Sequence, residues 1–176
     1  MKHRKIGLVL AALVAVTSAM ALTGVSSGST SSCTPGMTTV GGHSARKFCG
    51  PAKATVHVGK KTIKFAGGSC ERTGNALTLQ IGTVVLATTK NQKIPYFAVD
   101  IGKYLGANPG TPAARRDGTY TGGFVVVRTA AGAWDLNGFD KSVKVTLKGN
   151  RTHGTFTGKT YFSPHTRVTG TFTCGG

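Results

Sequence analysis

The chain has 176 residues, of which 22 are Lys or Arg and only five are Asp or Glu, so its formal net charge is +17. Such an excess of cations keeps a protein soluble and attracts polyanions over a long range. Apart from one apolar run near its start, the sequence has no long apolar stretch, which argues against an integral membrane protein.

Residues 1–21 have the pattern of a secretory signal peptide. A basic start is followed by an uncharged apolar run over 6–16 and by the small-residue cleavage motif Ala-Met-Ala at 19–21. The apolar run is shorter than the roughly 20 residues that a transmembrane helix needs. We therefore expect export, to a secreted or cell-envelope location. Cleavage leaves 155 residues with 19 cations and five acids, a net charge of +14.

Residues 22–52 form a Ser-, Thr- and Gly-rich spacer. The part between Cys33 and Cys49 could be a surface loop closed by a disulfide, either as an ordered flap on the domain or within a disordered tether. We expect one β domain over residues 53–176, a length that can bury a proper core.

All four cysteines lie after the signal peptide, so an exported chain would carry them into an oxidising compartment. Their spacings lack the close pairs of a zinc site, and two disulfides are expected. Three pairings are possible, and we favour Cys33 with Cys49 and Cys70 with Cys174.

After Pro51 the sequence changes to short runs of alternating apolar and polar residues separated by glycines, the pattern of β-strands. The expected strands are 54–58, 62–66, 76–81, 84–88, 96–101, 120–129, 133–136, 142–148, 154–160 and 166–174. HVGKKT and LKGNRT have the glycine of tight hairpin turns. Because no amphipathic helix is predicted, the fold class is all-β, an antiparallel sandwich or barrel stapled by disulfides.

The tetrad GTFT occurs twice, at 154–157 and 170–173. If the two copies form a hairpin with Phe156 opposite Phe172, the chain reverses at Pro164. One face of the hairpin would then carry Phe, Gly and Cys, and the other a double row of threonines. In this register Cys174 lies on the core side, where it could reach Cys70.

Residues 102–119 form the one long irregular segment, with two prolines and the Arg115-Arg116 pair. A loop of this length in a compact β domain is either functional or merely mobile. Tyr96 and Phe97 precede it and could line an apolar mouth with Tyr104 and Leu105, although a core position suits them better.

The segments ATVHVGKKTIKFAGGSC, LTLQIG and YFAVDIGKY and the closing GTFTG...VTGTFTC resemble the LpqH-type lipoprotein antigens of actinobacteria and related small exported proteins, over about residues 54–174. The resemblance implies a β-sandwich-like domain at the cell envelope, a disulfide between Cys70 and Cys174, and no known catalysis. In those lipoproteins the lipid-bearing cysteine follows the apolar run directly. Here Cys33 lies 12 residues past Ala21, so anchoring through Cys33 is only the alternative to secretion or wall association.

No catalytic constellation is evident, so we expect no enzyme and no cofactor. The five acids are scattered, the histidines lack metal-ligand spacing, and no G-x-S-x-G motif occurs.

A binding module that recognises a polyanion is the leading hypothesis, because a merely soluble protein would mix both signs of charge. We expect an anionic wall polymer, lipid headgroup or host surface. Nucleic acid is less suitable, since an exported protein seldom meets it. A passive envelope protein is the other alternative. The candidate contacts are Lys60, Lys61, Lys64, Arg115, Arg116, Lys144, Lys148, Arg151 and Lys159.

Overall fold

A computed structural model describes residues 33–86, 94–102, 113–138, 140–162 and 164–175. The predicted signal peptide, the first part of the predicted spacer and most of the 102–119 loop lie outside these residues. All regular structure in the described part is β-sheet, as the alternating sequence predicted, and none of it is a helix that could span a membrane. The strands are β1 (Gly36–Val40), β2 (His43–Phe48), β3 (Ala52–Val58), β4 (Lys61–Arg72), β5 (Ala76–Val85), β6 (Tyr96–Gly102), β7 (Gly118–Thr121), β8 (Phe124–Thr129), β9 (Gly132–Ala133), β10 (Lys144–Lys148), β11 (His153–Lys159) and β12 (Arg167–Thr173).

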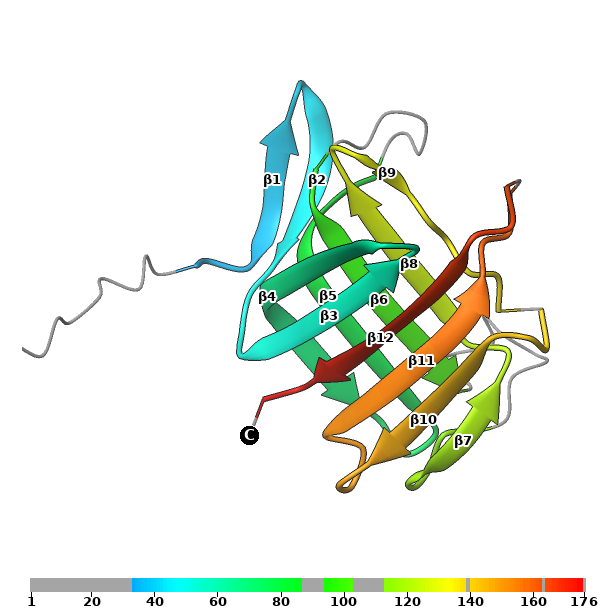
Figure 1. Cartoon of the computed structure of the whole chain (residues 1–176). Helices are drawn as coiled ribbons and strands as arrows, with labels where there is room; N and C mark the ends of the chain where they lie inside the picture. Colours follow the sequence, from blue (N-terminus) through cyan, green and yellow to red (C-terminus); the bar gives the residue numbers. More distant parts are fainter. Residues whose placement is uncertain (1–32, 87–93, 103–112, 139, 163, 176) are drawn as a thin grey trace, which may run out of the picture. The chain divides into compact units, whose positions relative to one another are not determined.

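One antiparallel sheet in the order β7-β10-β11-β12-β3-β4-β5-β6-β8-β9 folds over on itself to make two layers (Figure 1). The front layer contains β7, β10, β11, β12, β3 and the first half of β4. The second half of β4 continues into the back layer with β5, β6, β8 and β9. The pairing of β3 with β4 shifts register between Ala52 and Lys53, and Gly67, which has a φ of 81°, lies at this bulge. A bulge with a positive-φ glycine bends a strand, which lets β4 serve both layers.

The core lies between the inward faces of the two layers. Phe97 of β6 contacts Phe65 of β4 and Phe156 of β11, with ring centroids 5.4 and 5.6 Å apart. Leu79, Val127 and the other inward residues around them are almost completely buried. The period-two alternation therefore predicted correctly which side chains enter the core.

Both favoured disulfides are present. Cys33 is bonded to Cys49, and Cys70 is bonded to Cys174. The first closes the base of the β1–β2 hairpin, so this part of the spacer is an ordered flap, and β2 pairs with the end of β5. Strands β1 and β2 were not predicted, because their polar residues are mostly exposed and show no apolar alternation.

The doubled tetrad forms the β11–β12 hairpin, but the predicted register was wrong by two residues. Phe156 lies opposite Gly170 and Phe172 lies opposite Gly154. A shift of two keeps every side chain on its predicted face, because side chains alternate with period two. Each phenylalanine ring covers the glycine of the other strand: a Cβ on Gly170 would lie 2.5 Å from Phe156, and one on Gly154 would lie 2.6 Å from Phe172.

Three strand boundaries also differ from the prediction. Residues 120–129 are not one strand, because the chain turns at Gly122, which has a φ of 78°, and β7 and β8 join different layers. In contrast, β5 is continuous through Gly82, where two strands were predicted. Leu136, predicted within a strand, makes only an isolated bridge to Val125.

Candidate binding surface

The outward side chains of the front layer form rows that run across its strands. One row consists of Thr119, Thr146, Thr155, Thr171, Thr55 and Lys64, one from each of β7, β10, β11, β12, β3 and β4. A neighbouring row contains Thr121, Lys144, Thr157, Thr169, His57 and Thr62. The GTFT hairpin places four of these threonines, so the double row expected from the sequence continues over the whole layer.

Cations lie within and beside the threonine rows. A third row holds Lys148, His153, Thr173, Lys53 and Ala66, and Lys159 lies opposite Arg167 at the other end of the hairpin. We call the outward residues of these rows the threonine–lysine face. Its six permanent cations are Lys53, Lys64, Lys144, Lys148, Lys159 and Arg167, and all six are exposed.

No carboxylate belongs to the rows of the threonine–lysine face. Asp117 and Asp140 lie in connections beside it. Asp117 accepts hydrogen bonds from the backbone N–H groups of Asn150 and Arg151, which lower its pKa. Asp140 accepts one from Ser142, and its pKa is lowered as well. The rows themselves therefore carry only cations, whereas Asp117 and Asp140 interact with His153 and Lys159 at their margin.

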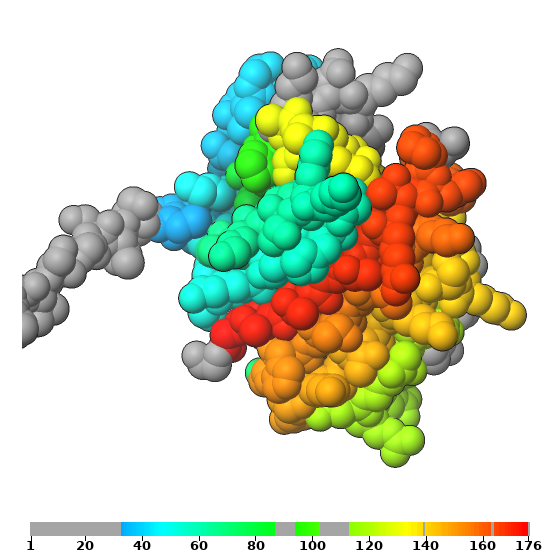
Figure 2. All heavy atoms as spheres, viewed as in Figure 1, coloured from blue at the N-terminus to red at the C-terminus, as the bar shows by residue number. Residues whose placement is uncertain are grey.

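The face is also polar throughout. Besides the threonines and cations, its rows contain two histidines and Ala66, but no aromatic or large apolar side chain. Two contacts link neighbouring strands: the hydroxyls of Thr119 and Thr146 are 2.9 Å apart, and His57 Nδ1 lies 3.0 Å from the Thr62 hydroxyl. Figure 2 shows β4, β3, β12, β11, β10 and β7 adjoining one another on this side of the molecule.

The structure brings four of the nine predicted candidates together on this face, namely Lys64, Lys144, Lys148 and Lys159. Lys60 and Lys61 lie at the exposed β3–β4 turn beyond the rows. Arg115 donates from Nε to Asn75 Oδ1 at 2.9 Å, and the backbone carbonyl of Arg116 accepts from the Tyr120 hydroxyl at 2.6 Å. Arg115 and Arg116 therefore contribute to the contacts of the segment that precedes β7, and they do not belong to the rows.

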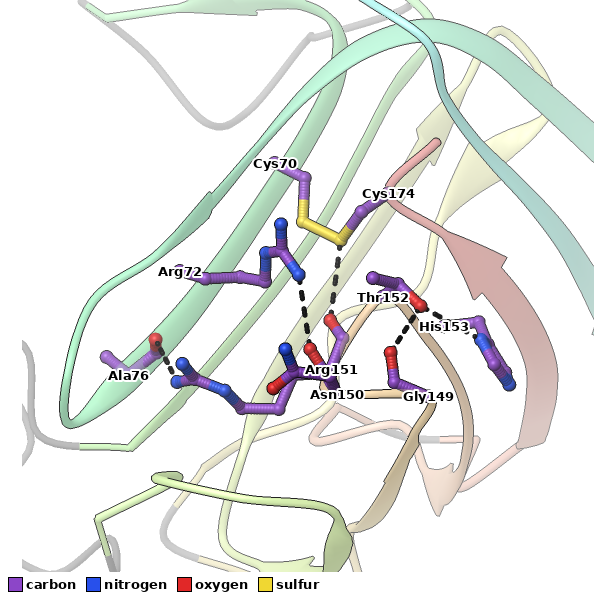
Figure 3. The surroundings of a disulfide bond; sticks show 9 residues. All are labelled: Cys70, Arg72, Ala76, Gly149, Asn150, Arg151, Thr152, His153 and Cys174. Carbon is purple, nitrogen blue, oxygen red and sulfur yellow. Dashed lines mark hydrogen bonds between the residues drawn. A yellow bond between two sulfur atoms is a disulfide. The ribbon is translucent and has the colours of Figure 1, made fainter. Parts of the chain in front are cut away.

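Arg151 has a structural role instead. Its guanidinium donates to the backbone carbonyls of Thr73, Ala76 and Ala114 at 2.7, 3.4 and 2.8 Å. The same turn accepts a hydrogen bond from Arg72 and contacts the sulfur of Cys174 (Figure 3). Because its donors face the protein interior, Arg151 is not part of the binding surface that we propose.

Lys53 and Arg167 belong to the face although they were not among the predicted candidates. Lys53 alternates with the buried Ala52 and Ala54, and Arg167 precedes the buried Val168. Alternation alone could have placed both side chains on the outward face, but it cannot show that β3 and β10 lie beside the β11–β12 hairpin. The histidines His57 and His153 were also not expected to join one surface.

Two further carboxylates lie in the back layer and are separate from each other. Asp100 is partly buried, and burial raises its pKa although Thr78 hydrogen-bonds to it. Asp135 forms an ion pair with Arg128 at 2.8 Å. Among the residues that the structure describes, no three His, Cys, Asp or Glu side chains are grouped as metal ligands.

Comparison with known proteins gives no match, since no family model, curated protein or solved structure is significantly similar to the chain.

Proposed function

We propose that this protein is an exported, noncatalytic binding protein whose threonine–lysine face holds an anionic polymer of a cell envelope. The observation that carries the proposal is the collection of six exposed cations on one face without a carboxylate among them. Net charge alone does not identify a partner. A face whose rows carry only positive charges and span six strands suits a long ligand with repeated negative charges.

The spacing of the cations favours many weak contacts. Neighbouring strands are about 4.8 Å apart and same-face residues on one strand are about 6.8 Å apart. Lys148 and Lys53 in one row are therefore separated by about 14 Å, which is more than the Debye length of about 8 Å at physiological salt. Each lysine can thus meet a separate anionic group, while the threonine hydroxyls between them offer hydrogen bonds to oxygen atoms of the polymer.

The composition of the face favours an extended anionic chain over two other polyanions. Binding of single-stranded nucleic acid uses aromatic side chains on which the bases stack, and the face has none. Stable attachment to a lipid surface needs apolar side chains that enter the membrane, and the face has none of these either. A wall polymer that carries phosphate or carboxylate groups needs only cations and hydroxyls.

Two disulfides in a chain of this length suit an oxidising, extracellular compartment. The signal peptide and the relationship to LpqH-type antigens remain predictions. Anchoring of a lipid through Cys33 is not part of the proposal, because its sulfur is bonded to Cys49.

The proposal can be tested by measuring binding of the protein, without its signal peptide, to immobilised poly(glycerol phosphate) and polygalacturonate. Neutral dextran is the control ligand. We expect both anionic polymers to bind, with affinity that falls at least about tenfold between 50 and 500 mM salt as screening increases. Binding that does not change with salt, or equal binding to dextran, would contradict the electrostatic mechanism.

The same assay separates the alternatives. Vesicles of phosphatidylglycerol, a sulfated glycosaminoglycan and duplex DNA stand for a lipid surface, a host surface and nucleic acid. Preference for any of these over the wall-type polymers would replace the ligand class that we propose. Failure to bind every polyanion would favour a passive envelope protein.

A further inference from the structure

An apolar groove of about 390 Å³ lies where the edge of the back layer meets the β11–β12 connection. Phe124 and Val126 of β8 line it together with Leu136, Tyr161 and Phe162. The backbone N–H of Tyr161 donates to the carbonyl of Asp135 at 2.9 Å and so joins the two sides. The volume lies within the range of small-molecule binding sites.

The groove displays two aromatic rings at unusual exposure. Tyr161 is 57% exposed and Phe162 is 71% exposed, and their rings contact edge to face with centroids 4.9 Å apart. Other large exposed apolar side chains of the described residues, Met37 and Leu86, lie in or next to the flap pairing. Aromatic side chains that are held together on a surface beside a hollow are typical of a binding site.

A buried threonine holds the connection that carries these rings. The hydroxyl of Thr160 lies 3.1 and 2.8 Å from the carbonyls of Phe162 and Pro164, which share its one proton, and it accepts from the backbone N–H of Thr166 at 2.9 Å. His165 also contacts the carbonyl of Thr160 through Nδ1 at 3.0 Å. The aromatic pair is thus preorganised, which lowers the entropic cost of binding a ligand.

The negative charge of Asp135 in the groove is balanced by an arginine. Arg128 pairs with Asp135 Oδ2, whereas Asp135 Oδ1 is buried and accepts no hydrogen bond from the described residues. The Asp135 side chain is 29% exposed although Oδ1 is not, so a hydrogen-bond donor on a ligand in the groove meets the part of the carboxyl group that pairs with Arg128. Asn137 adds an amide to the lining. In a protein with 22 Lys and Arg, this is an apolar site that offers acceptors rather than free cations.

We propose that the groove binds the ring of a neutral sugar. A pyranose ring has an apolar C–H face that can pack on Tyr161 or Phe162, and hydroxyls that can donate to Asp135 and Asn137. A carboxylate or phosphate group would be repelled by the Asp135 carboxylate, and an alkyl chain would displace water from the exposed part of the Asp135 side chain without offering a hydrogen bond in return. The shape and the polarity of the groove therefore favour a neutral saccharide. This site goes beyond the polyanion binding of the threonine–lysine face and does not depend on it.

The only tryptophan of the chain provides a direct probe. Trp134 lines a second hollow of about 130 Å³ together with Asp135, Phe162 and Thr166, next to the groove. We would titrate the protein with methyl glucoside, methyl galactoside, methyl mannoside and N-acetylglucosamine oligomers and follow tryptophan fluorescence. At least one of these neutral sugars should change the emission in a saturable manner that persists in 500 mM salt.

Three variants test the assignment. Phe162→Ala and Asp135→Asn should each weaken sugar binding at least fivefold, whereas Leu86→Ala, which removes an exposed apolar side chain elsewhere, should leave it unchanged. Retention of polyanion binding by Phe162→Ala would show that the protein is still folded. The proposal would be overturned if no sugar showed saturable binding, or if Phe162→Ala and Asp135→Asn bound the sugar as tightly as Leu86→Ala. Binding of octanoate in place of the sugars would identify an acyl-chain site instead. Loss of salt-sensitive polymer binding would bear only on the threonine–lysine face.

Discussion

The guanidinium of Arg151 contacts two backbone segments that lie about 35 to 80 residues from it in the sequence. It donates to the carbonyls of Thr73, Ala76 and Ala114, and the backbone N–H of Arg151 itself donates to Asp117 at 2.7 Å. Asn150 and Arg151 both have positive φ, so this turn needs such contacts to hold its conformation. A residue that composition suggests as an anion contact thus stabilises the fold.

Replacement of Arg151 by Met should lower the free energy of unfolding by about 2–4 kcal/mol, because buried carbonyls lose a charged donor. Urea denaturation would measure the change. Lys148→Met, which removes an exposed cation from the preceding strand, should change stability by less than about 0.5 kcal/mol. If the two substitutions changed the free energy of unfolding equally, the hydrogen bonds of Arg151 would not stabilise the fold as we expect.

Asp100 is expected to destabilise the protein at neutral pH. Burial raises its pKa above the ordinary value of 3.8, and its Oδ1 atom has no hydrogen-bond partner. A carboxyl group with a raised pKa binds its proton more tightly in the folded state, so stability falls as pH rises from the unfolded pKa to the folded pKa. Above that window the cost is fully present.

Asp100→Asn should therefore be more stable than the wild type at pH 7, and this advantage should shrink as the pH falls towards 3.8. Thermal unfolding of both proteins between pH 3.5 and 7.5 would measure the difference. Asp117→Asn is the matched control of opposite sign, since the backbone hydrogen bonds to Asp117 lower its pKa and their loss should destabilise the protein at pH 7. A constant difference between wild type and Asp100→Asn at all pH values would contradict the linkage.

At the scale of elements, the β11–β12 hairpin depends on two reciprocal pairs of phenylalanine and glycine. A Cβ on Gly170 would lie 2.5 Å from the ring of Phe156 and 2.5 Å from the carbonyl of Thr55. Gly170→Ala should thus destabilise the protein by about 1–3 kcal/mol through overpacking. Gly74→Ala is the control, because no atom lies within 4 Å of a Cβ at that position. Chemical denaturation in which both substitutions have the same effect would argue against the close packing.

The same hairpin shows how far the sequence determines an element. Alternation correctly predicted which face each residue of the two tetrads occupies. It could not predict the register, because that depends on the length of the connection, which the hydrogen bonds of Thr160 set. Likewise, alternation over 120–129 could not reveal the turn at Gly122, since the polar and apolar pattern continues on both sides of it.

At the scale of the whole molecule, the candidate surface was only partly predictable. The charge imbalance and the outward lysines follow from composition and alternation. The sharing of one face by β3, β10, β11 and β12 depends on strand order, and the other three strands are all about 90 residues or more from β3 in the sequence. The aromatic groove was not predicted at all, because Tyr161 and Phe162 meet β8 only after both layers have formed.

The central claim is that the threonine–lysine face, and not net charge alone, binds anionic polymer. The most direct test compares the double variant Lys64→Gln and Lys148→Gln with the control Lys47→Gln and Arg116→Gln, which removes the same charge from exposed positions outside the face. Binding to poly(glycerol phosphate) would be measured at several salt concentrations. The account predicts that the face variant binds at least about fivefold more weakly at low salt and has a shallower salt dependence. Equal weakening of both variants would show that net charge is sufficient and would contradict it.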